Sequence, residues 1–161
     1  VDFPHLRLIA IDTDGLHRMS DYTQVAFWLK KTLREAGKKF TIVIMHHPVY
    51  STAEGRFNPL MWLAFHGPLR EADVVFSGHD HNYARRTVQY KERFWKKEEP
   101  TIFIGTNASM KKYPVKENNI YDASLSGEPV YQYICVTHNT LHISTFNLLS
   151  AERIDHVEII H

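Results

Sequence analysis

The stretch VVFSGHDHNYARR, residues 74–86, passes from an apolar run directly into two histidines that are separated by one residue. Its first four residues predict a buried strand, because they form a short apolar run that ends at a turn. Gly78 then allows the chain to turn tightly and leaves space for a ligand or an ion close to the backbone. The stretch therefore predicts a strand that ends at a polar site.

The segments before this stretch alternate between strand and helix patterns. We expect strands at 6–12, 39–47 and 73–77 and helices at 20–37 and 58–67, with Asn58 as the cap of the second helix. The run at 39–47, KFTIVIMHH, is apolar almost throughout, as in a strand that is buried on both faces of a parallel sheet. This alternation is typical of an α/β layer with parallel strands.

The second half of the chain has a different pattern. Short strand-like runs separated by turns lie at 85–90, 101–107, 130–138, 140–147 and 156–160. The charge-dense segment YKERFWKKEEP, residues 90–100, is expected as a solvated hairpin tip. Cys135, the single cysteine, lies in an apolar run and is expected as a small buried hydrophobe.

The composition argues against several classes of partner. The chain has 161 residues, of which 43% are hydrophobic and 23% charged, and its formal net charge is +1. A charge this close to neutral gives no reason to expect nucleic acid or an acidic membrane surface as an obligatory partner. No apolar run approaches the roughly 18 residues that a membrane-spanning helix needs.

Histidines follow two neighbouring strands of the expected sheet. His46 and His47 end the run at 39–47, and His79 and His81 follow the run at 73–77. Because ligands bind beyond the carboxyl ends of parallel strands, these side chains are expected to face a common point. In an extended segment residues i and i+2 project the same way, so His79 and His81 are expected to reach one site or two adjacent ions. Neutral imidazole is a good ligand for zinc, iron and manganese, and the pattern therefore predicts a metal site.

These residues also carry a resemblance to a known family. VIMH at 43–46 and GHDHNYAR at 78–85 resemble the last two motifs of the calcineurin-like metallophosphoesterases, particularly those of the purple acid phosphatase branch. The resemblance runs from about residue 6 to residue 86. It implies an αββα fold, a β-sandwich flanked by helices, with two divalent or trivalent ions (Fe, Zn or Mn). It also implies that His46 and His79 bind one ion and that His81 binds the other.

The same resemblance suggests further functional residues. Tyr83 and Arg85 match the Y-x-R that follows the family motif, and His47 is placed either to reach the phosphate or to face solvent. Asn82 and Ala84 stand where the family pattern has Ala and Glu, so the acidic support usual at that point is missing. The activity implied is hydrolysis of a small-molecule or protein phosphate ester by attack of a metal-bound hydroxide.

Three upstream motifs of the family, D-x-H, G-D-x-x-D and G-N-H-D or their variants, do not occur in this sequence. They supply the carboxylates that offset the repulsion between two close cations. We therefore expect residues 1–161 to be the C-terminal part of a single metallophosphoesterase domain, weakly active or inactive without an N-terminal half. Asp80 is expected to point away from the ligands, and Asp12 and Asp14 follow a different strand. The branch implies a secreted or periplasmic location.

Two alternative functions remain open. IAIDTDGL, residues 9–16, resembles the opening motif of the haloacid-dehalogenase-like phosphatases, in which Asp12 would be the nucleophile and Asp14 the acid/base beside Mg²⁺. A polar turn after a strand explains the same residues, and we prefer that interpretation. The other alternative is a non-catalytic, β-rich binding domain that keeps the shape of a phosphatase. The sequence does not distinguish phosphate monoesters from diesters as substrates.

Overall fold

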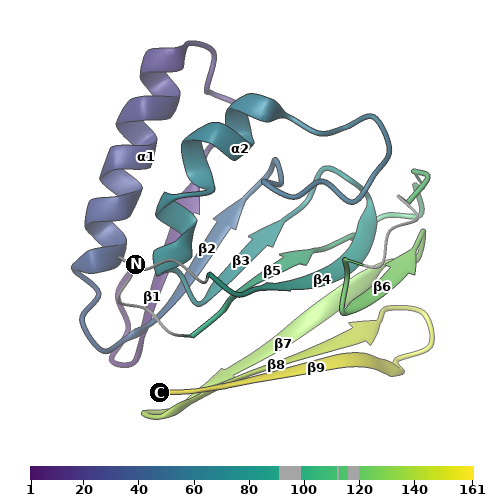
Figure 1. Cartoon of the computed structure of the whole chain (residues 1–161). Coiled ribbons are helices and arrows are strands. Elements are labelled where there is room, and N and C mark those ends of the chain that lie inside the picture. Colours follow the sequence, from purple (N-terminus) through teal and green to yellow (C-terminus); the bar gives the residue numbers. More distant parts are fainter. Residues whose placement is uncertain (91–98, 112, 116–119) are drawn as a thin grey trace.

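Two β-sheets pack face to face in the computed structural model, which describes residues 1–90, 99–111, 113–115 and 120–161. The larger sheet has six strands in the order β1-β2-β3-β5-β4-β6, and the smaller sheet has the order β7-β8-β9. Both helices lie on the outer face of the larger sheet, and the smaller sheet covers its other face (Figure 1). This architecture confirms the expected mixed α/β fold with a sandwich of sheets and flanking helices.

The parallel part of the larger sheet comes from the first two thirds of the chain. Its four strands are β1 (Leu6–Ile11), β2 (Phe40–Met45), β3 (Val74–Ser77) and β5 (Thr101–Gly105). The antiparallel strands β4 (Asn82–Val88) and β6 (Ala123–Ser126) complete the sheet, and the smaller sheet consists of β7 (Val130–Val136), β8 (Thr140–Asn147) and β9 (Arg153–Ile160). The sequence analysis missed β6, whose run ASLS is only four residues long and contains a single large apolar side chain, Leu125. The expected hairpin tip at 90–100 lies mainly outside the described residues.

Helix α1 (Met19–Arg34) and helix α2 (Pro59–Phe65) pack on the larger sheet through buried side chains that include Leu29 and Phe65. A short 3-10 helix, η1 (Pro68–Glu71), follows α2. The side-chain oxygen of Asn58 accepts hydrogen bonds from two backbone N–H groups in the first turn of α2, which confirms Asn58 as its cap. No helix among the described residues is both long enough and apolar enough to cross a membrane.

Each face of the larger sheet has its own apolar core. On the helix side, Leu29 and Phe65 are fully buried against Val43 of β2. On the other face, Ile42 of β2 packs with residues of the smaller sheet such as Ile143, which is 1% exposed. β2 and β3 therefore bury side chains on both faces, as the continuous apolar run at 39–47 predicted for β2.

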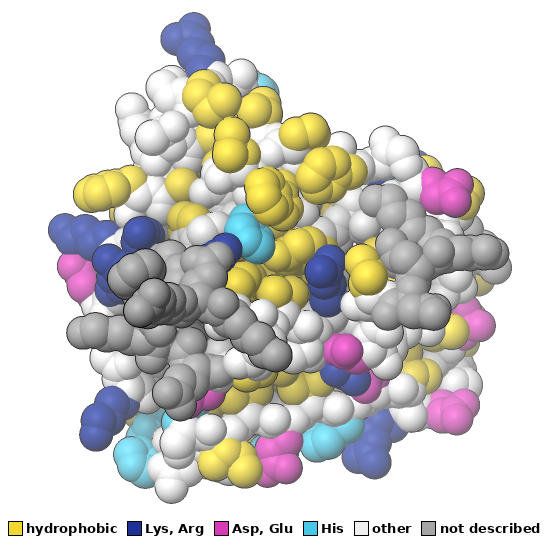
Figure 2. Space-filling view, in the orientation of Figure 1, with side chains coloured by type: hydrophobic (Ala, Val, Ile, Leu, Met, Phe, Trp, Pro, Cys, Tyr) yellow, Lys and Arg dark blue, Asp and Glu magenta, His cyan; other side chains and the backbone are white. Residues whose placement is uncertain are grey.

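The outer face of the smaller sheet differs from the expectation at one position. Cys135 is exposed there, opposite His142 of β8, and is not the buried hydrophobe expected from its neighbours. Residues of β7 alternate between the two faces of the sheet, and Cys135 falls on the outer one together with Tyr133, which is 64% exposed. A further apolar group on the surface surrounds α2, where Phe57, Trp62 and Leu63 are exposed, and hydrophobic side chains gather there in Figure 2.

Candidate metal site

Three parallel strands end at the same level, and the candidate site lies just beyond them. In the register of the sheet, Ile11 of β1 pairs with Met45 of β2, and Met45 pairs with Ser77 of β3. His46 and His47 follow directly after β2. Because the three strands end level with one another, the loops that follow them lie together at the carboxyl edge of the sheet. This is the edge at which the sequence predicted that the histidines would face a common point.

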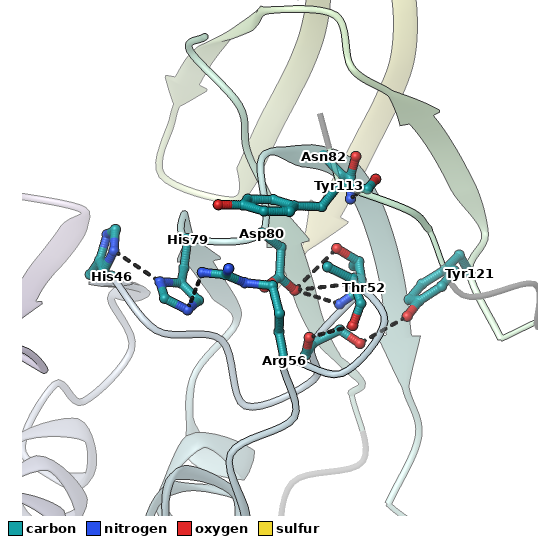
Figure 3. A network of polar contacts seen from close by, with 10 residues as sticks. His46, Thr52, Arg56, His79, Asp80, Asn82, Tyr113 and Tyr121 are labelled. Carbon is teal, nitrogen blue, oxygen red and sulfur yellow. Dashed lines mark hydrogen bonds and ion pairs between the residues drawn. The ribbon is translucent and has the colours of Figure 1, made fainter. Parts of the chain in front are cut away.

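Three histidines meet at this edge: His46, His47 and His79. Each offers a ring nitrogen, and these three nitrogens lie within 4.8 Å of one another. Nε2 of His46 and Nδ1 of His79 are only 3.2 Å apart (Figure 3). The ring of His47 lies 4.4 Å from that of His79, centroid to centroid. His46 is exposed, whereas the other two rings are half-buried.

This arrangement fits a transition-metal ion. Two nitrogens that bind one zinc ion at about 2.0–2.1 Å and at angles of roughly 90–110° stand about 2.9–3.4 Å apart. The separation of 3.2 Å between His46 and His79 falls within that range. Burial, helped by the nearby Arg56, lowers the pKa of His79 to about 4, and burial also lowers the pKa of His47 against the opposing effect of Asp14. Both rings are therefore neutral at neutral pH, which is the state that binds metal.

His81 does not join this group. His79 and His81 both have a left-handed backbone, with φ of 66° and 54°, so the segment is not extended and the expected i, i+2 alignment is wrong. Nδ1 of His81 lies 2.9 Å from Oγ of Ser109, and its ring stands edge-on to Tyr113 at 5.2 Å. His47, which the sequence placed at the phosphate or in solvent, takes the third place in the cluster instead.

Asp80, between these two histidines, turns into the protein. One oxygen of its carboxylate accepts hydrogen bonds from the backbone N–H of Thr52 at 2.6 Å and of Ala53 at 3.2 Å, and the residue is 2% exposed. It points away from the histidine cluster as expected, although the cause is the left-handed turn and not strand alternation. The carboxylate fixes the loop after β2 against the loop after β3.

Arg56, in the loop after β2, reaches back to the cluster. Its Nη2 lies 2.5 Å from Nε2 of His79. Because a guanidinium only donates hydrogen bonds, Nε2 of His79 is the acceptor, and Nδ1 carries the ring proton and donates it to His46. The two facing nitrogens of His46 and His79 thus share one proton, and a cation is the other species that they can share.

The loop after β1 holds His47. The backbone N–H of His47 donates to Oγ1 of Thr13 at 3.0 Å, and Nδ1 of His47 lies 3.1 Å from the same oxygen. A carboxylate oxygen of Asp14 is 3.7 Å from this Nδ1. Asp12, by contrast, accepts hydrogen bonds from the backbone N–H groups of Asp14 and Gly15 and so closes the turn after β1. Sequence reasoning did not assign Thr13 or Arg56 to the site, because neither belongs to a motif and only the folded sheet brings their loops to the histidines.

Tyr83 and Arg85 lie between the two sheets. The Tyr83 hydroxyl donates to Oδ2 of Asp155 at 2.5 Å, and Nε of Arg85 donates to the same oxygen at 2.6 Å. Arg85 also donates to Asp122 at 3.0 Å. Burial and the hydrogen bond to Asp155 raise the pKa of Tyr83, which is 1% exposed. The structure therefore does not bring these two residues to the histidine cluster; their contacts join β4 to β9.

The neighbours of Tyr83 in β4 are also buried. Asn82 is 1% exposed, and its side chain donates to the carbonyl of Tyr113 and accepts from the hydroxyl of Ser126. Ala84 is 3% exposed and pairs with Gly105 and Ser124 in the sheet. The two positions that depart from the family pattern are thus packing positions in this structure.

Residues 4–83 match the family model described as calcineurin-like phosphoesterase. A solved structure of a single mutant of Vps29 from Entamoeba histolytica is similar at 12% identity, with 96% of this chain and 98% of that chain covered and a TM-score of 0.37. A double mutant of Vps29 from the same organism is similar at 10% identity, with 97% and 98% covered and a TM-score of 0.34. None of the curated proteins compared with the chain matches it. Over residues 4–83 the chain is thus similar to the calcineurin-like phosphoesterases.

Proposed function

We propose that this protein contributes to a metal-dependent phosphoesterase and that His46 and His79 bind its metal ion. The observation that carries the proposal is the pair of facing nitrogens, Nε2 of His46 and Nδ1 of His79, which stand 3.2 Å apart. The pair lies at the edge of the parallel sheet where ligands bind, in the part of the chain that matches calcineurin-like phosphoesterases. Hydrolysis of a phosphate ester, of a small molecule or of a protein, is the proposed reaction.

A bound ion would supply Lewis acidity to a water molecule and to a phosphoryl oxygen. The residues of the chain do the rest. His46 and His79 hold the ion, and Thr13 fixes the ring of His47 through Nδ1, so that Nε2 of His47 is free of that contact. His47 is then placed to donate a hydrogen bond to the phosphate or to become a third ligand.

The purple acid phosphatase branch and a second ion are finer proposals. A second ion on His81 requires that ring to leave Ser109, to which its Nδ1 is now hydrogen-bonded. Two close cations also need carboxylates, and the histidine cluster contains none among the described residues. We propose that an N-terminal half of the same domain supplies them.

The test combines metal binding with turnover. The protein, alone and with the rest of the domain where that is expressed, is loaded with Zn²⁺, Mn²⁺ or iron and assayed with para-nitrophenyl phosphate and with its bis-ester. We expect metal-dependent hydrolysis that is lost in His46→Ala and His79→Ala and kept in His17→Ala, a matched control in the loop before α1. Equal activity in all four proteins would contradict the proposal.

A second candidate function is that of a non-catalytic binding domain. The observation that favours it is the shortage of negative charge: the carboxylate that approaches the cluster among the described residues is that of Asp14, at 3.7 Å from His47. Such a domain would bind one ion and hydrolyse neither ester. Stoichiometric metal with no turnover, also in the presence of the rest of the domain, would establish this alternative.

A further inference from the structure

We propose that Arg56 binds the phosphoryl group of the substrate at this site. The inference rests on the proposed function, because it needs a phosphate beside the histidines. Arg56 belongs to none of the family motifs, and its guanidinium lies against His79 at the edge of the cluster (Figure 3). Three features support the assignment: the way the side chain is held, the aromatic ring beneath it, and the acceptor that it now uses.

The loop that carries Arg56 is anchored next to the histidines. Asp80 immediately follows His79, and its carboxylate binds the backbone of Thr52 and Ala53, a few residues before Arg56. The other oxygen of the carboxylate lies 3.5 Å from Nε of Arg56. Asp80 therefore holds both the loop and the guanidinium, and it fixes the guanidinium relative to the cluster with little loss of entropy on binding.

The guanidinium of Arg56 stacks on the ring of Tyr113, so the N–H groups along the edge of the guanidinium can still donate hydrogen bonds. The central carbon of Arg56 is 4.3 Å from the centre of this ring, and the ammonium of Lys111 is 4.9 Å from it. Stacking on an aromatic ring keeps a guanidinium flat and oriented, and a planar fork of N–H groups matches the oxygens of a phosphate. Two cations beside one ring, next to a metal site, favour an anion as the ligand.

In the metal-free protein Arg56 donates to a nitrogen of His79 that would no longer accept a hydrogen bond once His79 binds metal. Nη2 of Arg56 donates to Nε2 of His79, which requires that Nε2 carry no proton. When Nδ1 of His79 binds an ion, the neutral ring carries its proton on Nε2, and that nitrogen becomes a donor. The amino group of Arg56 then loses its acceptor beside the ion. A phosphoryl oxygen is the acceptor that the reaction brings to this place.

An alternative role for Arg56 is purely structural, as the partner of the buried Asp80. The structural role needs only a hydrogen-bond donor to Asp80, whereas phosphate binding needs the charge and the fork of N–H groups. Arg56→Gln keeps a donor for Asp80 and removes the charge, whereas Arg56→Lys keeps the charge and removes the fork. Arg34→Ala is the matched control, since Arg34 lies at the end of α1 and pairs with Glu71, away from the loops of the site.

The experiment is a calorimetric titration of the metal-loaded protein with inorganic phosphate, with metal content and thermal midpoint measured for each variant. We expect Arg56→Gln to weaken phosphate binding by about 10-fold to 100-fold, the range of one or two charge-assisted hydrogen bonds, at unchanged metal content. Arg56→Lys should fall between, and Arg34→Ala should match the wild type.

Phosphate affinity within about twofold of the wild type in Arg56→Gln would overturn the inference, as would a loss of phosphate binding that follows only from a loss of metal. If the wild type binds no metal, the proposed function fails. The same titration on the metal-free protein then decides about Arg56 separately: weaker binding in Arg56→Gln supports the assignment, and equal binding or no binding by the wild type overturns it.

Discussion

Asp155→Asn tests whether Tyr83 and Arg85 serve the sandwich of sheets. The Asp155 carboxylate accepts four hydrogen bonds, one from Tyr83, two from Arg85 and one from the backbone N–H of His156, and its side chain is 10% exposed. Removing one partner of a buried ion pair costs about 3–5 kcal/mol. We expect the lower end of that range, about 3 kcal/mol, because Arg85 keeps Asp122 at 3.0 Å and asparagine keeps one acceptor oxygen.

The loss should appear in urea unfolding at pH 7 followed by circular dichroism, and as a fall in Tm of about 6–12 °C for a domain of this size. Burial acts to raise the pKa of Asp155, but the hydrogen bonds from Arg85 and Tyr83 outweigh it and hold this pKa below its ordinary value. A carboxyl group with a lowered pKa stabilises the fold above the pKa of the unfolded chain, near 4. The difference between wild type and variant should therefore be constant near neutral pH and shrink as the pH falls below about 4.

Asp122→Asn is the control, because its side chain is 39% exposed and its ion pair with Arg85 should contribute less than about 1 kcal/mol. Stability of Asp155→Asn within about 1 kcal/mol of the wild type would refute this account of the contacts between β4 and β9. So would a larger loss in Asp122→Asn than in Asp155→Asn.

Three further predictions concern the site and the loops around it. Asp80→Asn should destabilise the protein by about 2 kcal/mol in urea unfolding, since it removes a buried charge that accepts from the backbone of Thr52; a change below about 0.5 kcal/mol would argue against this anchor. Gly55→Ala should cost about 1 kcal/mol because Gly55 has φ of +67° and an added Cβ would meet nothing within 4 Å, so backbone strain alone is measured, and an unchanged Tm would contradict it. In NMR titration of the metal-free protein, the ring of His79 should titrate near pH 4. Because the same ring in the unfolded chain binds a proton below about pH 6.5, His79 lowers the free energy of unfolding only below that pH. A midpoint near 6.5 in the folded protein would contradict the burial of this ring beside Arg56.

Much of the fold follows from local patterns. The apolar run at β2 predicted a strand buried on both faces, the run at β3 predicted a buried strand, and Asn58 marked the start of α2, because burial and capping act on neighbouring residues. β6 was missed because ASLS is held by pairing with β4, which is distant in sequence. Cys135 was misplaced because an apolar run does not show which face of a strand meets the other sheet.

The site was predictable only in part, for a related reason. Strand ends locate loops, so the meeting of His46 and His79 could be expected from the order of strands. The direction of each ring depends on backbone torsions, and the left-handed conformation at His79 and His81 overturned the simple alternation. Arg56 is brought in by the fold alone, through a carboxylate contact between two loops.

The most direct test of the metal site is a metal titration of the histidine cluster itself. Co²⁺ is added to the wild type and to a His46→Ala, His79→Ala double variant, while visible absorption and, after desalting, metal content are measured. We expect at least one ion per wild-type chain, with the absorption of nitrogen-bound Co²⁺, and loss of that ion in the double variant. Equal metal content and equal spectra in the two proteins would show that Nε2 of His46 and Nδ1 of His79 do not bind metal.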